Sequence, residues 1–166
     1  MLKLIKNGKP VTDPWKTLTL KDRETPESVR LPVGPVLVPL SVWKSRKAEL
    51  IHREYEHGWP IGIWLNQEDQ PEHIAEDIED FSVIAIEFDR HSDGNGFRIA
   101  RALREQYGYS GELRATGDIP ADKPVFQRQA VFDSYTTGHN RKFGNFLSEW
   151  PSFDDALQQR PVATSA

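Results

Sequence analysis

Several residue types and patterns are scarce in this 166-residue chain, and cysteine is missing altogether. Without cysteine there are no disulfides, Fe–S ligands, catalytic thiolates or cysteine-based zinc sites. No apolar run approaches the ~20 residues that cross a bilayer. The amino-terminal MLKLIKNGKP also lacks the apolar segment and cleavage site of a signal peptide. We therefore expect a cytoplasmic protein, with which the lack of cysteine is compatible.

Basic charge is not in excess either, since the net charge is −4. Proteins that follow a phosphate backbone normally carry a basic excess or stripe, so we expect neither nucleic acid nor a membrane as partner. The length suits one domain with a sizeable core. We expect a single domain over 1–166, with an amino-terminal hairpin and arm over 1–32, a core over 33–160 and a tail over 161–166.

The pattern of residues changes near position 35. Before it, Asn7-Gly8 between LKLIK and KPV predicts a β-hairpin over 2–12, and the proline-containing segment 13–32 predicts an irregular arm. After it, apolar strands alternate with helices. Strands are predicted over 36–40, 61–65, 83–88, 112–116 and 132–136. Helices are predicted from Ser41 as N-cap through Tyr55, around 74–78, over 97–107, near 123–131 and near 152–159.

This alternation predicts an α/β fold with about five mostly parallel strands. The spacing leaves two arrangements open, an open three-layer sheet and a curled sheet like part of a (β/α) barrel. In both arrangements functional sites gather where the strands end at their carboxyl edge. Polar residues at three strand ends are candidates: Asn66 and Gln67; Asp89, His91 and Asp93; Gly117 and Asp118, with Arg114 on the strand itself.

The residues at the end of strand 83–88 suggest two kinds of site, one for a metal ion and one for a dinucleotide. The alternating Glu87, Asp89, His91 and Asp93 have the oxygen and nitrogen atoms of a hard-cation site, but solvated charge is the commoner state, and we predict no metal. The Gly94-Asn95-Gly96 stretch invites a dinucleotide-binding fingerprint. Its third glycine is replaced by Ile99, which favours a turn with Asp or Asn capping the next helix. We therefore predict no NAD, flavin, haem or Fe–S cofactor.

Arg114 raises a sharper question, because it lies within an otherwise apolar strand. An unpaired buried guanidinium costs several kcal/mol. One interpretation is an internal ion pair with Asp118, Asp89 or Glu112, and the other is contact with a ligand or partner at the carboxyl edge, within reach of the loop from Asp93 to Arg98. Asp122, two residues before Pro124, fits a helix cap better than a catalytic role.

Together these residues resemble a known family. The stretch DGNGFRIARALREQYGYSGELRATGD, followed by FD at 132–133, is similar to the core of the bacterial domain of unknown function 934 family. The hairpin leading to DPW (13–15) is also similar. The matching positions are Asp93, Gly94, Gly96, Phe97, Ala100, Arg101, Leu103, Arg104, Gly108, Tyr109, Gly111, Glu112, Leu113, Arg114, Ala115, Gly117, Asp118, Asp122, Phe132 and Asp133.

The resemblance implies a metabolic setting. Members are often labelled oxidoreductases involved in sulfite reduction, and their genes commonly lie beside those for sulfite reductase and other sulfate-assimilation enzymes. The chain departs from the family pattern at Asn95, where arginine is usual, and at Arg98, where serine is usual; Pro120, Ala121 and Lys123 also differ. Arg98, one turn into the helix, is a candidate to restore the missing charge.

Two functions remain open at this point. The first is an accessory protein of assimilatory sulfite reduction that binds sulfite reductase or another sulfate-assimilation enzyme through the carboxyl edge of its sheet. The second is an α/β enzyme of unknown reaction with an oxyanion-binding pocket around Arg114. The candidate ligand- or partner-binding residues are Asp93, Gly94, Gly96, Arg98, Arg114, Gly117, Asp118 and Asp122.

Overall fold

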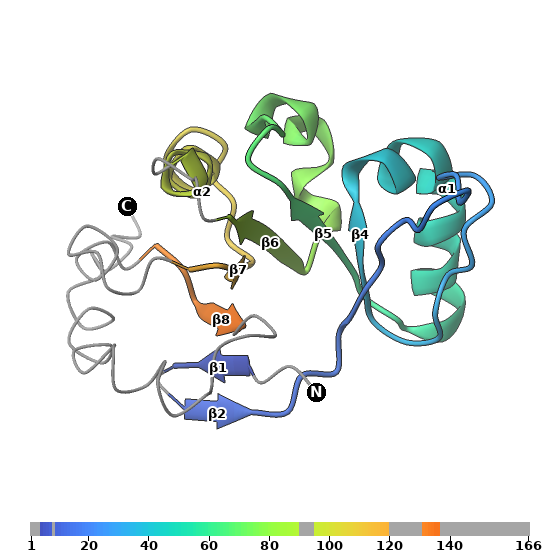
Figure 1. The fold of residues 1–166 in the computed structure, drawn as a ribbon, viewed down its shortest axis with the longest axis horizontal. Coiled ribbons are helices and arrows are strands. Elements are labelled where there is room, and N and C mark those ends of the chain that lie inside the picture. Colours follow the sequence, from blue (N-terminus) through green and yellow to red (C-terminus); the bar gives the residue numbers. More distant parts are fainter. Residues whose placement is uncertain (1–3, 8, 90–94, 120–130, 137–166) are drawn as a thin grey trace.

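The fold is known from a computed structural model that describes residues 4–7, 9–89, 95–119 and 131–136. Within these residues, eight strands form one sheet in the order β2-β1-β8-β7-β6-β5-β4-β3 (Figure 1). The strands are β1 (Leu4–Lys6), β2 (Lys9–Val11), β3 (Lys16–Thr17), β4 (Val36–Pro39), β5 (Ile61–Leu65), β6 (Val83–Phe88), β7 (Glu112–Gly117) and β8 (Ser134–Thr136). The helices are α1 (Leu40–His57), α2 (Asn95–Glu105) and two 3₁₀ helices, η1 (Pro71–His73) and η2 (Ala75–Asp80).

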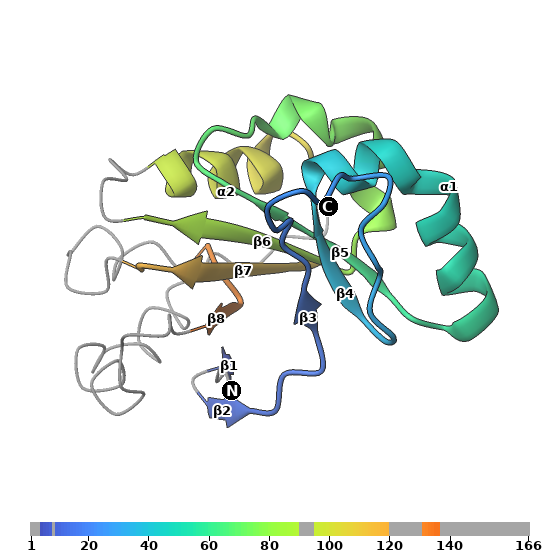
Figure 2. The ribbon, with the colours of Figure 1, turned by 45° about the vertical axis from the view of Figure 1, so that its right-hand side comes forward.

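The expected α/β class with mostly parallel strands is confirmed. Strands β3 to β8 run parallel to their neighbours, and the β1–β2 hairpin adds antiparallel pairs at β8. The sheet curls into a half-barrel, which decides between the two arrangements that the sequence left open. The helices lie on the convex side of the arc (Figures 1 and 2).

The curl follows from how the chain connects the two edges of the sheet. Strands β2 and β3 are the edge strands, yet only residues 12–15 separate them. Five Cα–Cα steps reach at most about 18 Å, far less than the width of eight flat strands at about 4.8 Å each. The sheet must therefore bend until its edges approach. We call residues 12–15 the strap.

The convex face holds the main apolar core. Side chains that alternate along the strands, among them Ile84, Ile86 and Leu113, pack there against α1 and α2. Helix α2 contributes Ile99 and Leu103, both fully buried. Burial of such side chains contributes roughly 1.5–3 kcal/mol each. The opposite, concave face has a smaller apolar cluster of Leu37, Val83 and Ala85, with Trp15 and Trp64 packed against it.

Some elements differ from the predictions. The arm contains β3, which the sequence did not indicate because two residues carry too little periodicity. Helix α1 begins at Leu40 after Pro39, so Ser41 is not its N-cap. Arg46 has non-helical backbone angles (φ −130°), which mark a kink within the helix. Tyr55, in its second half, is exposed. The helices expected near 123–131 and 152–159 lie outside the described residues.

Candidate functional site

A row of side chains crosses the concave face from one strand to the next. Strand register places Lys6, Ser134, Arg114, Ala85 and Trp64 side by side, on β1, β8, β7, β6 and β5. We call these five residues the concave row. Its β1–β8–β7 half is polar, whereas its β6–β5 half is apolar. Because residues alternate between faces along a strand, Arg114 faces away from the helices while Leu113 and Ala115 face them.

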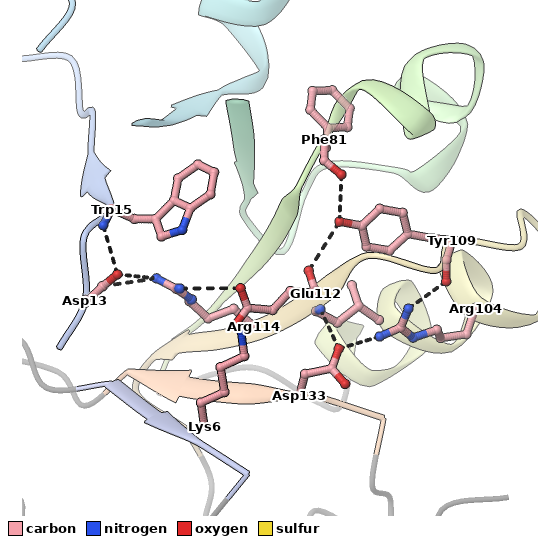
Figure 3. Close-up of polar contacts among 10 residues, drawn as sticks. Lys6, Asp13, Trp15, Phe81, Arg104, Tyr109, Glu112, Arg114 and Asp133 are labelled. Carbon is pink, nitrogen blue, oxygen red and sulfur yellow. Dashed lines mark hydrogen bonds and ion pairs between the residues drawn. The ribbon is translucent and has the colours of Figure 1, made fainter. Parts of the chain in front are cut away.

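Arg114 is held by the strap. Its Nη1 donates to both oxygens of Asp13, at 3.2 and 3.1 Å, and its Nη2 lies 3.7 Å from Glu112 Oε2 (Figure 3). Lys6 Nζ approaches the other oxygen of Glu112 at 3.5 Å. The backbone N–H of Trp15 donates to Asp13 Oδ1 at 3.0 Å and fixes the carboxylate. The carboxylates of Asp13 and Glu112 thus offset the positive charges of Arg114 and Lys6. Arg114 itself is 1% exposed.

These contacts correct the expected position of Arg114. It was predicted to reach the carboxyl edge beside Asp118 and the helix-start loop, but it lies mid-strand opposite Ala85 and contacts Asp13 and Glu112. The internal ion-pair interpretation therefore holds, with Glu112 as one of the anticipated partners. Asp13 was missed because it is 101 residues away in sequence. The sequence signal for Asp13 was the DPW stretch (13–15), which is part of the family resemblance.

Much of the family-like segment builds a clamp at the other end of β7. Arg104 Nη1 donates to the carbonyls of Tyr109 at 2.6 Å and Gly111 at 2.8 Å, and its Nη2 donates to Asp133. Asp133 also accepts the N–H of Leu113 at 2.9 Å (Figure 3). These bonds tie the end of α2 to both β7 and β8. Their role is to position the strands.

Tyr109 belongs to the same clamp. Its hydroxyl donates to the carbonyl of Phe81 at 3.0 Å, and its ring leaves no room for a side chain on Gly111, whose Cβ would lie 2.3 Å from the hydroxyl. Burial raises the pKa of Tyr109, so the phenol stays protonated and remains a hydrogen-bond donor.

Glycine is required at two of the predicted site positions. Gly117 has φ +82°, and a Cβ there would lie 2.4 Å from the carbonyl oxygen of Phe88. A Cβ on Gly96 would lie 2.5 Å from the Phe88 ring. Both glycines therefore allow the ends of β6, β7 and the start of α2 to approach closely. The space is taken by protein rather than by a ligand.

The carboxyl edge itself is acidic. Glu87 lies near the end of β6 and Asp89 follows the strand. Asp118 follows β7, and its N–H donates to the carbonyl oxygen of Phe88 at 2.8 Å. Burial first, and then the negative charges of Asp89 and Asp118, raise the pKa of Glu87. The Glu87 side chain is nevertheless largely exposed, so the raised pKa reflects crowding by like charges and nearby protein at a surface position.

Three polar side chains connect the neighbouring loops at this edge. Gln67 Nε2 donates to the Glu87 carbonyl, Asn95 Nδ2 donates to the Gln67 carbonyl, and Arg98 Nε donates to Asn95 Oδ1 at 2.9 Å. Arg98 also reaches Gln70 Oε1 at 3.3 Å. The guanidinium of Arg98 thus lies beside position 95, where arginine was expected from the resemblance.

The structure brings together only part of the predicted site. Gly96, Arg98, Gly117 and Asp118 lie around the carboxyl edge, and Arg114 lies apart from them. Asp93, Gly94, Asp122 and the potential metal ligand His91 lie outside the described residues. Among the described residues, no group of three or more His, Asp or Glu side chains is arranged to hold a metal ion. In the same residues, no helix is both long and apolar enough to cross a membrane.

Comparison with known proteins gives a family but no activity. Residues 62–166 match the profile of a family described as "Bacterial protein of unknown function (DUF934)". The chain belongs to this family. No curated protein and no solved structure gave a significant match. The DUF934 match spans α2, the Arg104 clamp and the carboxyl edge of β5 to β7. It begins after the strap, so Asp13 and Trp15 lie outside it.

Proposed function

We propose that this DUF934 protein is an accessory protein of assimilatory sulfite reduction that acts by binding rather than by catalysis. Its binding surface is the acidic carboxyl edge formed by Glu87, Asp89 and Asp118. The partner is sulfite reductase or another enzyme of sulfate assimilation, which meets this edge with a basic surface. The sulfur setting comes from the resemblance given above.

The observation that carries this proposal is the pairing of Arg114 with Asp13 and Glu112. An oxyanion pocket requires a cation whose charge is available, yet with the strap in place Arg114 is paired with two carboxylates and is 1% exposed. The three carboxyl groups of the edge, Glu87, Asp89 and Asp118, also disfavour an anion there. An acidic edge instead suits a basic partner surface, because complementary charge speeds and orients association.

The first test uses a bacterium that encodes this chain. Deleting its gene should impair growth on sulfate as sole sulfur source and leave growth on cysteine normal. The tagged full-length protein, purified from sulfate-grown cells, should bring down sulfite reductase or another sulfate-assimilation enzyme. Normal growth of the deletion strain on sulfate would sink the proposed setting.

Charge variants then locate the binding surface. The pair Asp89→Asn and Asp118→Asn should reduce co-purification at least several-fold, and melting temperatures measured on the same samples separate a loss of binding from a loss of folding. The control removes the same number of charges elsewhere, by Asp22→Asn and Glu79→Gln, both at exposed positions. Equal recovery of the enzyme with both variants would move the binding surface away from the carboxyl edge.

A further inference from the structure

The strap fits the concave row as a ligand would. Asp13 reaches Arg114 in the polar half of the row. Two residues later, Trp15 packs against the apolar cluster of Leu37, Val83 and Ala85, the last of which belongs to the apolar half of the row. A carboxylate and a flat aromatic ring, two residues apart, therefore match the polar and apolar halves of one surface.

Gly62 on β5 makes room for the ring. A Cβ on this residue would lie 3.1 Å from Trp15 Cζ3 and 2.4 Å from Leu37 Cδ2. A larger residue would clash first with Leu37 and with the carbonyl oxygen of Val83, 2.9 Å away, and would also crowd the Trp15 ring. The absence of a side chain at Gly62 therefore lets both Leu37 and the Trp15 ring lie close to the sheet.

The strap fills the polar half only in part. Both hydrogen bonds to Asp13 come from Arg114 Nη1, and Arg114 Nε is buried with no hydrogen-bond partner among the described residues. Ser134 Oγ, next to Arg114 in register, is also buried and has none within the same part of the chain. A carboxylate can engage an arginine through two parallel N–H donors, which is stronger than contact with one nitrogen. A ligand freed from the strap's short connection can make this better arrangement, which Asp13 does not.

The strap is also easy to detach. Thr12, Pro14 and Lys16 are exposed, so Asp13 and Trp15 are its inward anchors. Strand β3, which follows it, has two residues. Segments with few buried contacts open locally at a small fraction of the free energy of global unfolding. Opening exposes Arg114 and the apolar half of the concave row.

We propose that Asp13 and Trp15 act as an internal ligand, and that the concave row binds in their place a partner peptide with an acidic residue two positions before an aromatic one. The acidic side chain of the peptide pairs with Arg114 and Ser134. Its aromatic ring takes the place of the Trp15 ring beside Gly62. This site lies on another part of the sheet than the carboxyl edge and does not depend on the sulfur setting.

The probe is a labelled peptide copied from residues 12–17, TDPWKT, measured by fluorescence anisotropy. Full-length protein with Asp13→Asn and Trp15→Ala, which empties the site, should bind it with a Kd on the order of 100 μM. The wild type should bind at least about tenfold more weakly, because a tethered strap competes at an effective concentration near millimolar. Adding Arg114→Met to the emptied variant should abolish binding, as should replacing the probe by TNPAKT.

The native protein provides a second measurement that needs no substitution. The amides of Lys16 and Leu18 bond to the carbonyls of Pro35 and Leu37, and their hydrogen exchange reports opening of the strap. Excess TDPWKT should speed exchange at both amides, and TNPAKT should not. Unchanged exchange with TDPWKT, or equal affinity of the peptide for wild-type and emptied protein, would overturn the proposal.

Discussion

The two faces of strand β7 differ sharply although their residues alternate along one short segment. Leu113 and Ala115 face the helices and are fully buried among apolar side chains. Arg114, between them, is 1% exposed on the concave face, where it contacts Asp13 and Glu112. The three side chains are buried to the same extent. On the convex face apolar contacts favour this burial, whereas on the concave face ion pairs offset the cost of burying a charge.

This difference shows two ways of holding a sheet. The convex face is stabilised by many interchangeable apolar contacts, none of which depends on a single partner. The concave face has a smaller apolar cluster and, beside it, the charged contacts of Arg114, one of which joins positions 101 residues apart. A buried ion pair adds little net stability, but removing one partner leaves a buried charge without compensation. The pair therefore specifies where the strap closes the half-barrel.

The largest effect is expected from Arg114→Met, which keeps the length of the side chain and removes its charge. Asp13 would lose its ionic partner and Glu112 would keep Lys6 alone, at a cost of about 4 kcal/mol. Urea unfolding measures the loss. The double variant with Asp13→Asn should recover part of it, because one stranded carboxylate is removed. A loss of unfolding free energy under about 0.5 kcal/mol would show that Arg114 behaves as a solvated surface residue. The two faces of β7 would then not differ in the way described.

On the convex face, Leu113→Ala should destabilise by about 3 kcal/mol, from lost burial and the cavity left behind. Leu113→Met, which conserves volume, should cost less than about 1.5 kcal/mol. The same urea titration compares the two. If Leu113→Met lowers the free energy of unfolding as much as Leu113→Ala, the apolar contacts of the convex face are not interchangeable and depend on the exact shape of the side chain.

The Arg104 clamp joins the helical layer to the strands and should give an intermediate effect. Arg104→Met removes the donors to the carbonyls of Tyr109 and Gly111, at a cost of about 2 kcal/mol. The matched control is Arg101→Met, exposed on the same helix, which should change stability by less than about 0.5 kcal/mol. Equal melting temperatures for the two variants would contradict the clamp.

The smallest effect concerns Glu87 at the carboxyl edge, and it depends on pH. Because the folded pKa of Glu87 is raised, wild-type stability falls as pH rises through the interval between the unfolded and folded pKa values. Glu87→Gln cannot ionise, so it should match wild type near pH 4 and exceed it near pH 8, by under about 0.5 kcal/mol for so exposed a group. Greater stability of the wild type near pH 8 would contradict the acidic edge.

Much of the fold was predictable from local patterns. The alternation of apolar runs gave β4, β5 and β6, because burial on both faces makes such strands continuously apolar. Strand β7 was also predicted, although Glu112 and Arg114 interrupt its apolar residues. Asn7-Gly8 gave the hairpin of β1 and β2. Helix α2 was predicted two residues late at each end, over 97–107 instead of Asn95–Glu105, because capping and fraying at helix ends leave a weak sequence signal.

The site was predicted less well than the fold. Gly117 and Asp118 were expected at the carboxyl edge and lie there, since the end of a strand follows from its apolar pattern. The family-like residues Arg104, Tyr109 and Asp133 carried no predicted role, and each proved to bond the ends of neighbouring elements. Their spacing along the chain gives no hint of these contacts, which form only when α2, β7 and β8 are assembled.

The sequence by itself determined the fold class, with its mostly parallel strands, and the family, because both are written in local residue patterns. Tertiary structure decided the curl of the sheet and the environment of Arg114. Both depend on the four-residue strap between the two edge strands, and on Asp13 within it. A contact that spans 101 residues leaves no local pattern, since it is specified by which strands become neighbours once the sheet has closed.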